Sequence, residues 1–294
     1  MFVNDCLNVN EKGHLTIGGC DTLDLAKEYG TPLYVLDENV IRETCRSYVN
    51  SFKKFYDGNG MPLYASKALS CKELCRIAKD ENIGLDVVSG GEIYTALQSV
   101  FPMEKVHFHG NNKTADEIKF AIESKVGKFV VDNLYELELL DKIAGDMGKK
   151  VNISFRIKPG VDAHTHNFIR TGQIDSKFGF ALETGEAFEA VKEALKLNNV
   201  TLNELHCHIG SQIFDIDPFV TAAEIMMDFI GKIKNELGIT ISELNLGGGF
   251  GIMYTSKDEP VPYENYMEKV SVAVKAKSAE YGLPVPFIYI EPGR

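Results

Sequence analysis

Short apolar runs rich in β-branched and aromatic residues alternate along the chain with longer amphipathic stretches of helical period. Eight apolar runs are typical of buried strands: Pro62–Ser66, Leu85–Ser89, Val106–His109, Phe129–Asp132, Val151–Ile157, Glu204–Ile209, Glu243–Leu246 and Phe287–Ile290. The helical stretches between them include Ala115–Ser124, Leu134–Met147, Thr184–Leu197, Pro218–Leu237 and Tyr263–Tyr281. Strands that alternate with helices predict a parallel sheet, and eight of them predict an α/β fold of the (β/α)8 TIM-type barrel class. A doubly wound open sheet is the alternative, but no GxGxxG follows the first strand.

Two features depart from a plain barrel. Residues 1–36, including His14–Ile17 and Leu33–Leu36, fit short strands and turns outside the alternation. The sequence also stops at Arg294, where the eighth strand ends and before any eighth helix. We therefore predict N-terminal strands (1–36) of a second β domain that is largely absent through C-terminal truncation, and a barrel (37–294) that ends at its eighth strand.

Composition excludes several classes of protein. The 294 residues are 44% hydrophobic and 25% charged, which is typical of a soluble globular protein with a large core. A net charge of -11 without a Lys/Arg run argues against nucleic acid or an anionic membrane as partner. No apolar stretch reaches the roughly 20 residues of a membrane span, and the N-terminus lacks the apolar core of a signal peptide. The six cysteines form no CxxC pair and are expected to be reduced thiols of a cytoplasmic protein.

The ends of the predicted strands carry the candidate chemistry, because barrel enzymes place their active sites on the loops that follow. Lys67 closes the first strand, where partial desolvation of its amine would favour Schiff-base chemistry, although such a lysine also commonly extends into solvent. Gly247–Gly249 would let backbone N–H groups approach an anion, and a tight turn is the alternative. Gly210–Ser211 and Gly293–Arg294 offer donors from neighbouring strand ends, so together these segments suggest one phosphate site.

Acidic and basic side chains at other strand ends are expected to face the same space. Glu291 ends the eighth strand, where a buried carboxylate needs a partner. That partner could be a protonated heterocyclic nitrogen or an arginine. Asp86 and Arg156 are expected to point inward as supporting residues.

Six of the seven histidines form H-x-H pairs, which suggests a rival function: His107/His109, His164/His166 and His206/His208. Residues i and i+2 share a face of a strand, so each pair could present two imidazoles to a metal, as metal-dependent barrel hydrolases do. Such enzymes place the pair on the first strand and an aspartate after the last. Here those positions hold a lysine and Glu291, so we predict no metal and expect His107 and His206 to be satisfied core histidines.

Six motifs together resemble those of the fold-type III pyridoxal-phosphate decarboxylases, in the same order from about residue 20 to the end. They are Tyr64-Ala-Ser-Lys67-Ala68, Asp86-Val-Val-Ser-Gly-Gly-Glu92, His107-Phe-His-Gly-Asn-Asn-Lys113, His206-Cys-His-Ile-Gly-Ser-Gln212, Gly247-Gly-Gly-Phe-Gly251 and Glu291-Pro-Gly-Arg294. The His107–Lys113 motif and the long Pro159–Phe180 segment favour the branch acting on diaminopimelate over the ornithine and arginine branches. A racemase or a non-enzymatic cofactor-binding protein with the same barrel fits these two features less well.

The resemblance implies the cofactor pyridoxal 5'-phosphate and conversion of meso-2,6-diaminopimelate to L-lysine and CO2, the last step of lysine biosynthesis. Another basic amino acid or a polyamine precursor is the alternative substrate, and a metal-dependent hydrolase is less favoured. By the resemblance, Lys67 would carry the cofactor as a Schiff base and His208 would lie against its ring, which makes these two the expected catalytic residues. The other implied cofactor contacts are Glu291 at the pyridine nitrogen, Asp86 in support, and Ser211, Gly248, Gly249, Gly293 and Arg294 at the phosphate. Arg294 would also meet a substrate carboxylate.

The family further implies a homodimer, in which a C-terminal domain completes the partner subunit's active site for a small amino-acid substrate. This chain alone is therefore expected to decarboxylate weakly or not at all. The segment Pro159–Phe180 would form a lid, with Gly160, Gly172 and Gly179 as hinges.

Overall fold

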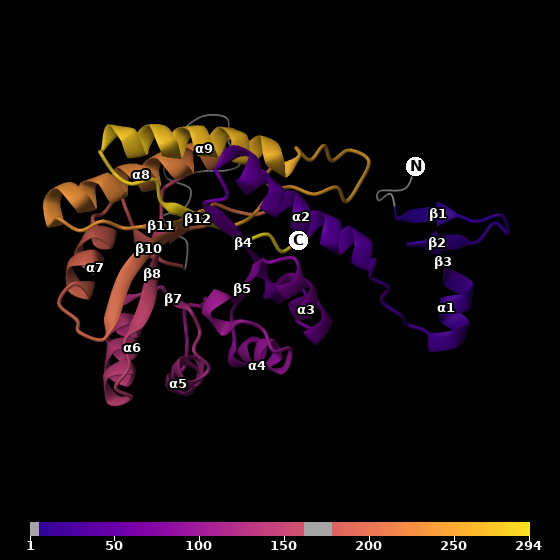
Figure 1. Ribbon diagram of the computed structural model, residues 1–294, viewed down its shortest axis with the longest axis horizontal. Helices are drawn as coiled ribbons and strands as arrows, with labels where there is room; N and C mark the ends of the chain where they lie inside the picture. The colour runs from indigo at the N-terminus through magenta and orange to yellow at the C-terminus, as the bar shows by residue number, and fades with distance from the viewer. Residues whose placement is uncertain (1–5, 162–177) are drawn as a thin grey trace.

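Eight parallel strands close into a barrel in the computed structural model, which describes residues 6–161 and 178–294 (Figure 1). The barrel strands are β4 (Gly60–Ala65), β5 (Gly84–Val87), β6 (Val106–Phe108), β7 (Lys128–Val131), β8 (Val151–Lys158), β10 (Val200–Cys207), β11 (Glu243–Asn245) and β12 (Phe287–Ile290). The barrel closes because β12 pairs with β4 and β10 pairs with both β8 and β11. A short strand, β9 (Phe180–Ala181), pairs with β8. The (β/α)8 prediction is confirmed, and the open-sheet alternative is wrong.

Helices cover the outside of the barrel, and each follows one of its strands in the chain. They are α3 (Lys72–Asp80), α4 (Gly90–Gln98), α5 (Ala115–Glu123), α6 (Leu134–Asp146), α7 (Glu186–Ala194), α8 (Asp217–Leu237) and α9 (Tyr263–Glu280), with 3-10 turns η1 (Ser66–Ala68) and η2 (Met103–Lys105). Three of them start at capping side chains: Ser89, Thr114 and Asn133 each accept a hydrogen bond from a backbone N–H of the first turn. Strand ends and helix starts are thereby held in fixed positions around the rim.

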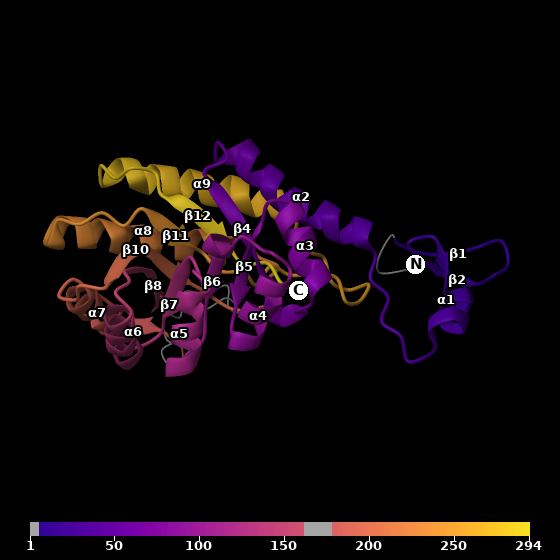
Figure 2. The same cartoon turned by 60° about the horizontal axis from the view of Figure 1, so that its bottom comes forward.

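The eighth helix of the barrel comes from before the first strand, which the sequence analysis missed. α2 (Glu38–Phe55) runs beside α9, as both views show (Figure 2). The rings of Tyr48 and Tyr263 lie 4.4 Å apart, and Lys54 Nζ is 3.0 Å from a carboxylate oxygen of Glu264. The flank beside α9 that appeared to lack a helix is therefore covered by α2.

A small N-terminal unit is drawn apart from the barrel in both views. It holds a three-stranded antiparallel sheet of β1 (Leu7–Val9), β2 (Leu15–Ile17) and β3 (Cys20–Asp21), followed by α1 (Thr22–Tyr29). Of the two segments expected to form short strands and turns, His14–Ile17 contains β2, whereas Leu33–Leu36 has no helix or strand. Its Tyr34 side chain is fully exposed. Assignment of this unit to a second domain remains a prediction.

The predicted lid lies mostly at residues 162–177, outside the described part of the chain, together with His164, His166 and Gly172. The flanking hinge candidates Gly160 and Gly179 have φ angles of 73° and 77°, a left-handed conformation that favours glycine. All six cysteines lie among the described residues, and none of them forms a disulfide there. Among the described residues, none of the helices has the length and hydrophobicity that crossing a membrane requires.

Candidate active site

A cavity of about 830 Å³ opens at the carboxyl ends of the barrel strands. Its lining includes most of the predicted site residues: Lys67, His208, Ser211, Gly249, Glu291, Gly293 and Arg294. The other two lie directly behind this wall. Asp86 Oδ2 is 3.9 Å from Lys67 Nζ, and the N–H of Gly248 donates to His208 Nδ1 at 3.3 Å. The structure therefore brings every predicted site residue together.

Lys67 stands on the turn η1 just beyond β4, not on the strand itself. The hydroxyl of the preceding Ser66 donates to the backbone oxygen of Asp86 at 2.9 Å and ties this turn to β5. The Lys67 side chain is 60% exposed within the cavity. Lys67 was expected to close the first strand with its amine at the strand's carboxyl end, and the turn η1 instead carries it just past that end.

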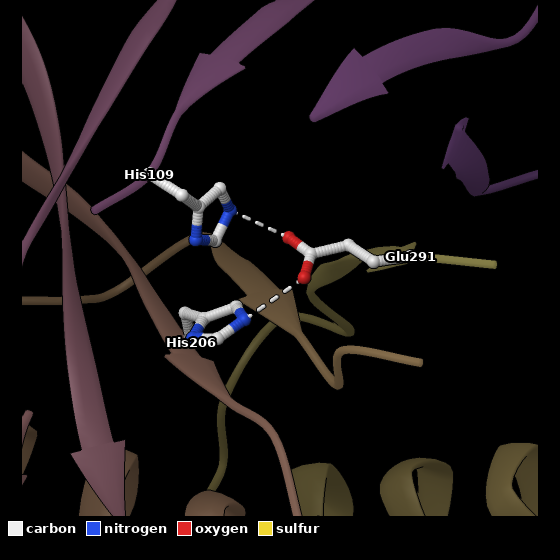
Figure 3. Close-up of side chains that lie close together, drawn as sticks. All are labelled: His109, His206 and Glu291. Carbon is white, nitrogen blue, oxygen red and sulfur yellow. Dashed lines mark hydrogen bonds and ion pairs between the residues drawn. The ribbon is translucent and has the colours of Figure 1, made fainter. Parts of the chain in front are cut away.

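A buried carboxylate of the cavity lining, Glu291, lies between two imidazoles (Figure 3). Glu291 Oε1 lies 2.7 Å from His109 Nε2, and Glu291 Oε2 lies 3.1 Å from His206 Nε2. Asn245 Nδ2 also donates to Glu291 Oε1 at 2.8 Å. Glu291 and its three partners come from four different strand ends, so closure of the barrel assembles the cluster.

The charges of this cluster follow from burial and proximity. Burial raises the pKa of Glu291, but His109 and His206 outweigh it, and the pKa falls well below its ordinary value. Burial lowers the pKa of His109, yet the carboxylates of Asp86 and Glu291 outweigh that effect and raise it. Burial lowers the pKa of His206 to about 4, so this ring is neutral near pH 7. Glu291 and His109 therefore form a buried ion pair.

The expectation for His107 and His206 is only half right. Both are buried, but neither is satisfied, because the Nδ1 atoms of both lack a hydrogen-bond partner among the described residues. His206 instead presents its other nitrogen to Glu291, and His107 Nδ1 lies 3.8 Å from Glu204 Oε1. A strand pattern identifies which residues share a face, but not which groups from other strands they meet.

The ligand atoms of His109, His206 and Glu291 lie within 4.8 Å of one another, a spacing that a metal ion would also accept. A metal ligand, however, has to be a neutral imidazole. His109 Nε2 and Glu291 Oε1 are in direct contact at 2.7 Å, which favours an ion pair between them over two ligands of one ion and disfavours the metal-hydrolase alternative.

His208 is held as a flat neutral wall of the cavity. Its Nδ1 accepts the Gly248 N–H, which leaves the proton on Nε2. Burial, followed by the nearby Arg156, lowers the pKa of His208 to about 4. A Cβ atom at Gly247 would lie only 3.0 Å from this side chain, so glycine allows the close approach.

Hydrogen-bond donors gather at the opposite end of the cavity. Arg294 donates from Nη2 to Ser211 Oγ at 3.0 Å and from Nη1 to the Tyr254 hydroxyl at 2.6 Å. Within residues 6–161 and 178–294, the backbone N–H groups of Gly249 and Gly293 have no hydrogen-bond partner. A guanidinium, a hydroxyl and unpaired N–H groups form a donor set that suits a phosphate.

Sequence reasoning missed two residues of the site. His109 was recognised only as part of a motif, although its position just after β6 signals the rim of the barrel. Tyr254 stands on the loop after β11 and holds Arg294, and no pattern in the sequence indicates that contact. Arg156 was expected to point inward, and it lines the cavity with its guanidinium 4.4 Å from the Phe178 ring centre.

Comparison with known proteins assigns a family to this architecture. Residues 39–294 match the family model described as pyridoxal-dependent decarboxylase, pyridoxal binding domain. Diaminopimelate decarboxylase of Bacillus methanolicus is 48% identical over 294 residues, which cover 100% of this chain and 68% of that protein. Diaminopimelate decarboxylase of Bacillus subtilis (strain 168) is 46% identical over 100% of this chain and 67% of its own length. The crystal structure of diaminopimelate decarboxylase from M. jannaschii in co-complex with L-lysine superposes with a TM-score of 0.89 at 37% identity, covering 100% of this chain and 67% of that one.

Proposed function

The chain belongs to the family of pyridoxal-dependent decarboxylases, and from this premise we propose that it removes CO2 from meso-2,6-diaminopimelate to give L-lysine. The proposal rests on one observation. The same cavity is lined by the amine of Lys67, the buried carboxylate of Glu291 and a set of hydrogen-bond donors that suits a phosphate. The substrate follows from the relatives, since those that cover the whole chain at 46–48% identity are diaminopimelate decarboxylases.

The residues present fit pyridoxal 5'-phosphate by their chemistry. Lys67 offers an amine for the aldehyde, and Glu291 offers an ionised carboxylate for a protonated ring nitrogen. The donors around Ser211 and Arg294 suit the phosphate. A volume of about 830 Å³ also lies in the range of roughly 300–1,000 Å³ usual for small-molecule sites.

Each residue then has a separate task. Lys67 would hold the cofactor through its amine, which could also accept or return a proton at the reacting carbon. His208 supports one face of the ring and, being neutral, adds no charge that would compete with the ring nitrogen. Glu291 keeps the ring nitrogen protonated because its own proton affinity is low and its second oxygen is held by His206. The bound cofactor supplies an electron sink for the electron pair left at the substrate's α-carbon when CO2 departs.

The phosphate end fixes the position of the ring relative to Lys67. Gly249 and Gly293 allow the backbone to approach an anion closely, and Ser211 adds a hydroxyl. We further propose that Arg294, whose planar fork matches a carboxylate, contacts the substrate in addition to the phosphate. Asp86 acts through Lys67, from which it is separated by 3.9 Å.

We propose a homodimer whose active site also draws on the part of the sequence that the relatives have beyond the span matched here. We place the enzyme in the cytoplasm, where its six free cysteines would stay reduced. Decarboxylation of another basic amino acid or a polyamine precursor is the alternative for the same site.

A competition among substrates tests the proposal. The natural protein that contains this sequence is incubated with pyridoxal phosphate and, separately, with meso-diaminopimelate, L-lysine, L-ornithine and L-arginine, and CO2 release is measured. We expect the highest kcat/KM with meso-diaminopimelate, with L-lysine as product. A higher kcat/KM with ornithine, arginine or lysine would move the enzyme to another branch of the family. Lys67→Ala is the matched control for cofactor-dependent release.

A further inference from the structure

The carboxylate assigned to the cofactor's ring nitrogen already has a cationic partner in the ligand-free protein. Glu291 Oε1 lies 2.7 Å from His109 Nε2, and both groups are buried, at 8% and 4% exposure. His206 and Asn245 hold the same carboxylate only as neutral hydrogen-bond partners. His109 is therefore the partner that balances the charge of Glu291.

Other charged or titratable groups also face His109. Asp86 of β5 has Oδ1 3.8 Å from His109 Nε2, and the His206 ring of β10 lies 4.8 Å away between centroids. The remaining groups that act on its charge are Arg156 of β8, His107 of β6 and His208 after β10. Lys67 faces Asp86 at 3.9 Å. The two nearest are carboxylates, so the surroundings favour a positive imidazole while the cavity is empty.

We propose that His109 stands in for the cofactor's ring nitrogen on Glu291, and that cofactor binding exchanges one cation for the other with release of the His109 proton to solvent. This inference rests on the proposed function. In the exchange, the cofactor brings its ring N–H to the carboxylate, the proton on His109 Nε2 departs to the buffer, and no other bond to these two groups changes. His109 is thus a positioning residue, because it acts through Glu291.

The exchange follows from the cost of buried charge. An ionised carboxylate without a cation in the barrel interior would be strongly disfavoured and would take up a proton. A protonated Glu291 could no longer accept the N–H of a cationic ring. Once that ring is present, two cations would compete for one carboxylate that has a single strong ion-pair contact, and the imidazole is the one that can lose its proton near pH 7.

The exchange makes cofactor affinity depend on pH with a defined sign. Below the pKa of His109, binding must expel a proton, so affinity rises as the pH rises, by about tenfold per pH unit for one proton. Above that pKa the imidazole is already neutral, and this dependence vanishes. The pKa of His109 lies above its ordinary 6.5, so the effect covers the lower side of neutrality.

Proton release can be counted directly by titration calorimetry. Pyridoxine 5'-phosphate is the probe, because it has the ring nitrogen and the phosphate but no aldehyde for Lys67. Titrations at about pH 6, near the ordinary pKa of imidazole, are run in two buffers of different ionisation enthalpy. The phosphate of either ligand has a second pKa near about 6 and loses the same fraction of a proton on binding. We therefore expect the wild-type chain to release close to one proton more per site with pyridoxine 5'-phosphate than with the analogue whose ring nitrogen is replaced by carbon. Equal release with both ligands would overturn the proposal, and this comparison needs no variant.

Matched variants assign the proton to a residue. His109→Gln keeps a donor next to Glu291 but cannot titrate. We therefore expect binding to persist while the extra proton released with pyridoxine 5'-phosphate, relative to the carbon analogue, disappears together with the corresponding difference in pH dependence. His206→Gln removes the other imidazole on Glu291 and should leave the proton count unchanged, since His206 is neutral. Loss of the extra proton in the His206 variant, or its persistence in the His109 variant, would refute the assignment.

The proposed function is tested separately in the same samples. A wild-type chain that binds neither pyridoxine phosphate nor pyridoxal phosphate would contradict the cofactor itself, and the exchange would fall with it. If pyridoxine phosphate and pyridoxal phosphate both bind normally but no proton is released from His109, the cofactor assignment stands and only the exchange is refuted.

Discussion

The buried charge of Asp86 lowers the stability of the folded protein. Asp86 is 1% exposed, and its Oδ1 has no hydrogen-bond partner among the described residues. Burial, partly offset by His109, raises its pKa from 3.8 to about 6. Asp86 faces Lys67 although its ionisation is unfavourable. We infer that the site keeps this carboxylate for its function at the expense of stability.

Asp86→Asn should therefore stabilise the ligand-free chain at pH 7. A raised pKa means that the folded state binds the proton more tightly than the unfolded state, so stability falls as pH rises from 3.8 to about 6. The variant escapes this loss. Its advantage is at most about 3 kcal/mol above pH 6 and should vanish below pH 3.8. Urea unfolding of both proteins at a series of pH values measures it, and a variant less stable than wild type at pH 7 would contradict the sign.

Sequence patterns could locate single site residues but not their partners. Lys67 and Glu291 were predictable because each follows a buried strand, and strand ends of a barrel share one rim. The contact between His109 and Glu291 was not, because it depends on closure of β12 onto β4 and on side-chain directions across the barrel. Tyr254 belongs to a loop without periodicity, so its contact with Arg294 leaves no signal.

At the scale of elements, one buried lysine fastens the loop between β6 and α5 that begins with His109. Lys113 Nζ donates to the backbone oxygens of Gly110 and Val130 and to Glu136 Oε1, at 2.8, 2.7 and 2.7 Å. Glu136 in turn accepts the Asp132 N–H through its other oxygen at 3.2 Å. This network joins the loop to β7 and α6.

Lys113→Met should destabilise the chain by about 3–5 kcal/mol, because it leaves the buried carboxylate of Glu136 without its cation. Lys113→Met/Glu136→Gln should recover part of that loss, since the unpaired charge is gone. Chemical unfolding of the two single variants and the double variant gives the coupling energy. Additive effects of the two substitutions would show that the pair does not act as a clamp.

The ends of β11 and β12 meet so closely that only glycine fits between them. A Cβ atom at Gly248 would lie 2.0 Å from the backbone oxygen of Glu291. Gly248→Ala should therefore push the Glu291 strand end away and weaken cofactor binding by about tenfold or more. Gly91→Ala is the control, because its Cβ would meet only Ser89 Oγ at 3.8 Å and alanine favours the helix. Fluorescence titration with pyridoxal phosphate distinguishes them, and equal affinities would contradict the steric argument.

Elements were predictable in proportion to what they bury. The barrel strands were found because runs such as Phe129–Val131 are buried on both faces and read as continuous apolar segments. α1 has no buried residue and leaves no apolar stripe to detect. α2 buries only Ser51 and Phe52 fully, and its main partner is another helix, α9, so the strand–helix alternation did not include it.

For the whole molecule, the repeat count was enough to predict a closed barrel, whereas the setting of the N-terminal unit was not. The sheet of that unit is antiparallel and lies apart from the barrel. It therefore lacks the parallel strand order and the shared core from which the barrel was predicted. The oligomeric state could not be predicted either, because the hydrophobic periodicity of helices and strands carries no information about contacts between subunits.

The 294-residue chain should bind the cofactor yet turn over slowly. We expect kcat at least about 10²-fold below that of a chain extended to the length of its relatives, since positioning of the substrate would be incomplete. Cofactor affinity should differ far less, because the described cavity already provides the amine, the carboxylate and the phosphate donors. Rates of CO2 release measured with the two proteins test this prediction, and equal rates would refute it.

The central claim is that Lys67 holds pyridoxal phosphate in the cavity at the end of the barrel. The most direct test is the absorption spectrum of the protein mixed with pyridoxal phosphate, before and after borohydride, followed by peptide mapping. We predict a band near about 420 nm, characteristic of an imine of this cofactor, that disappears on reduction and leaves a pyridoxyl group on Lys67. Lys67→Ala should show neither the band nor the labelled peptide. A label on another lysine, or an unchanged band in the variant, would contradict the account.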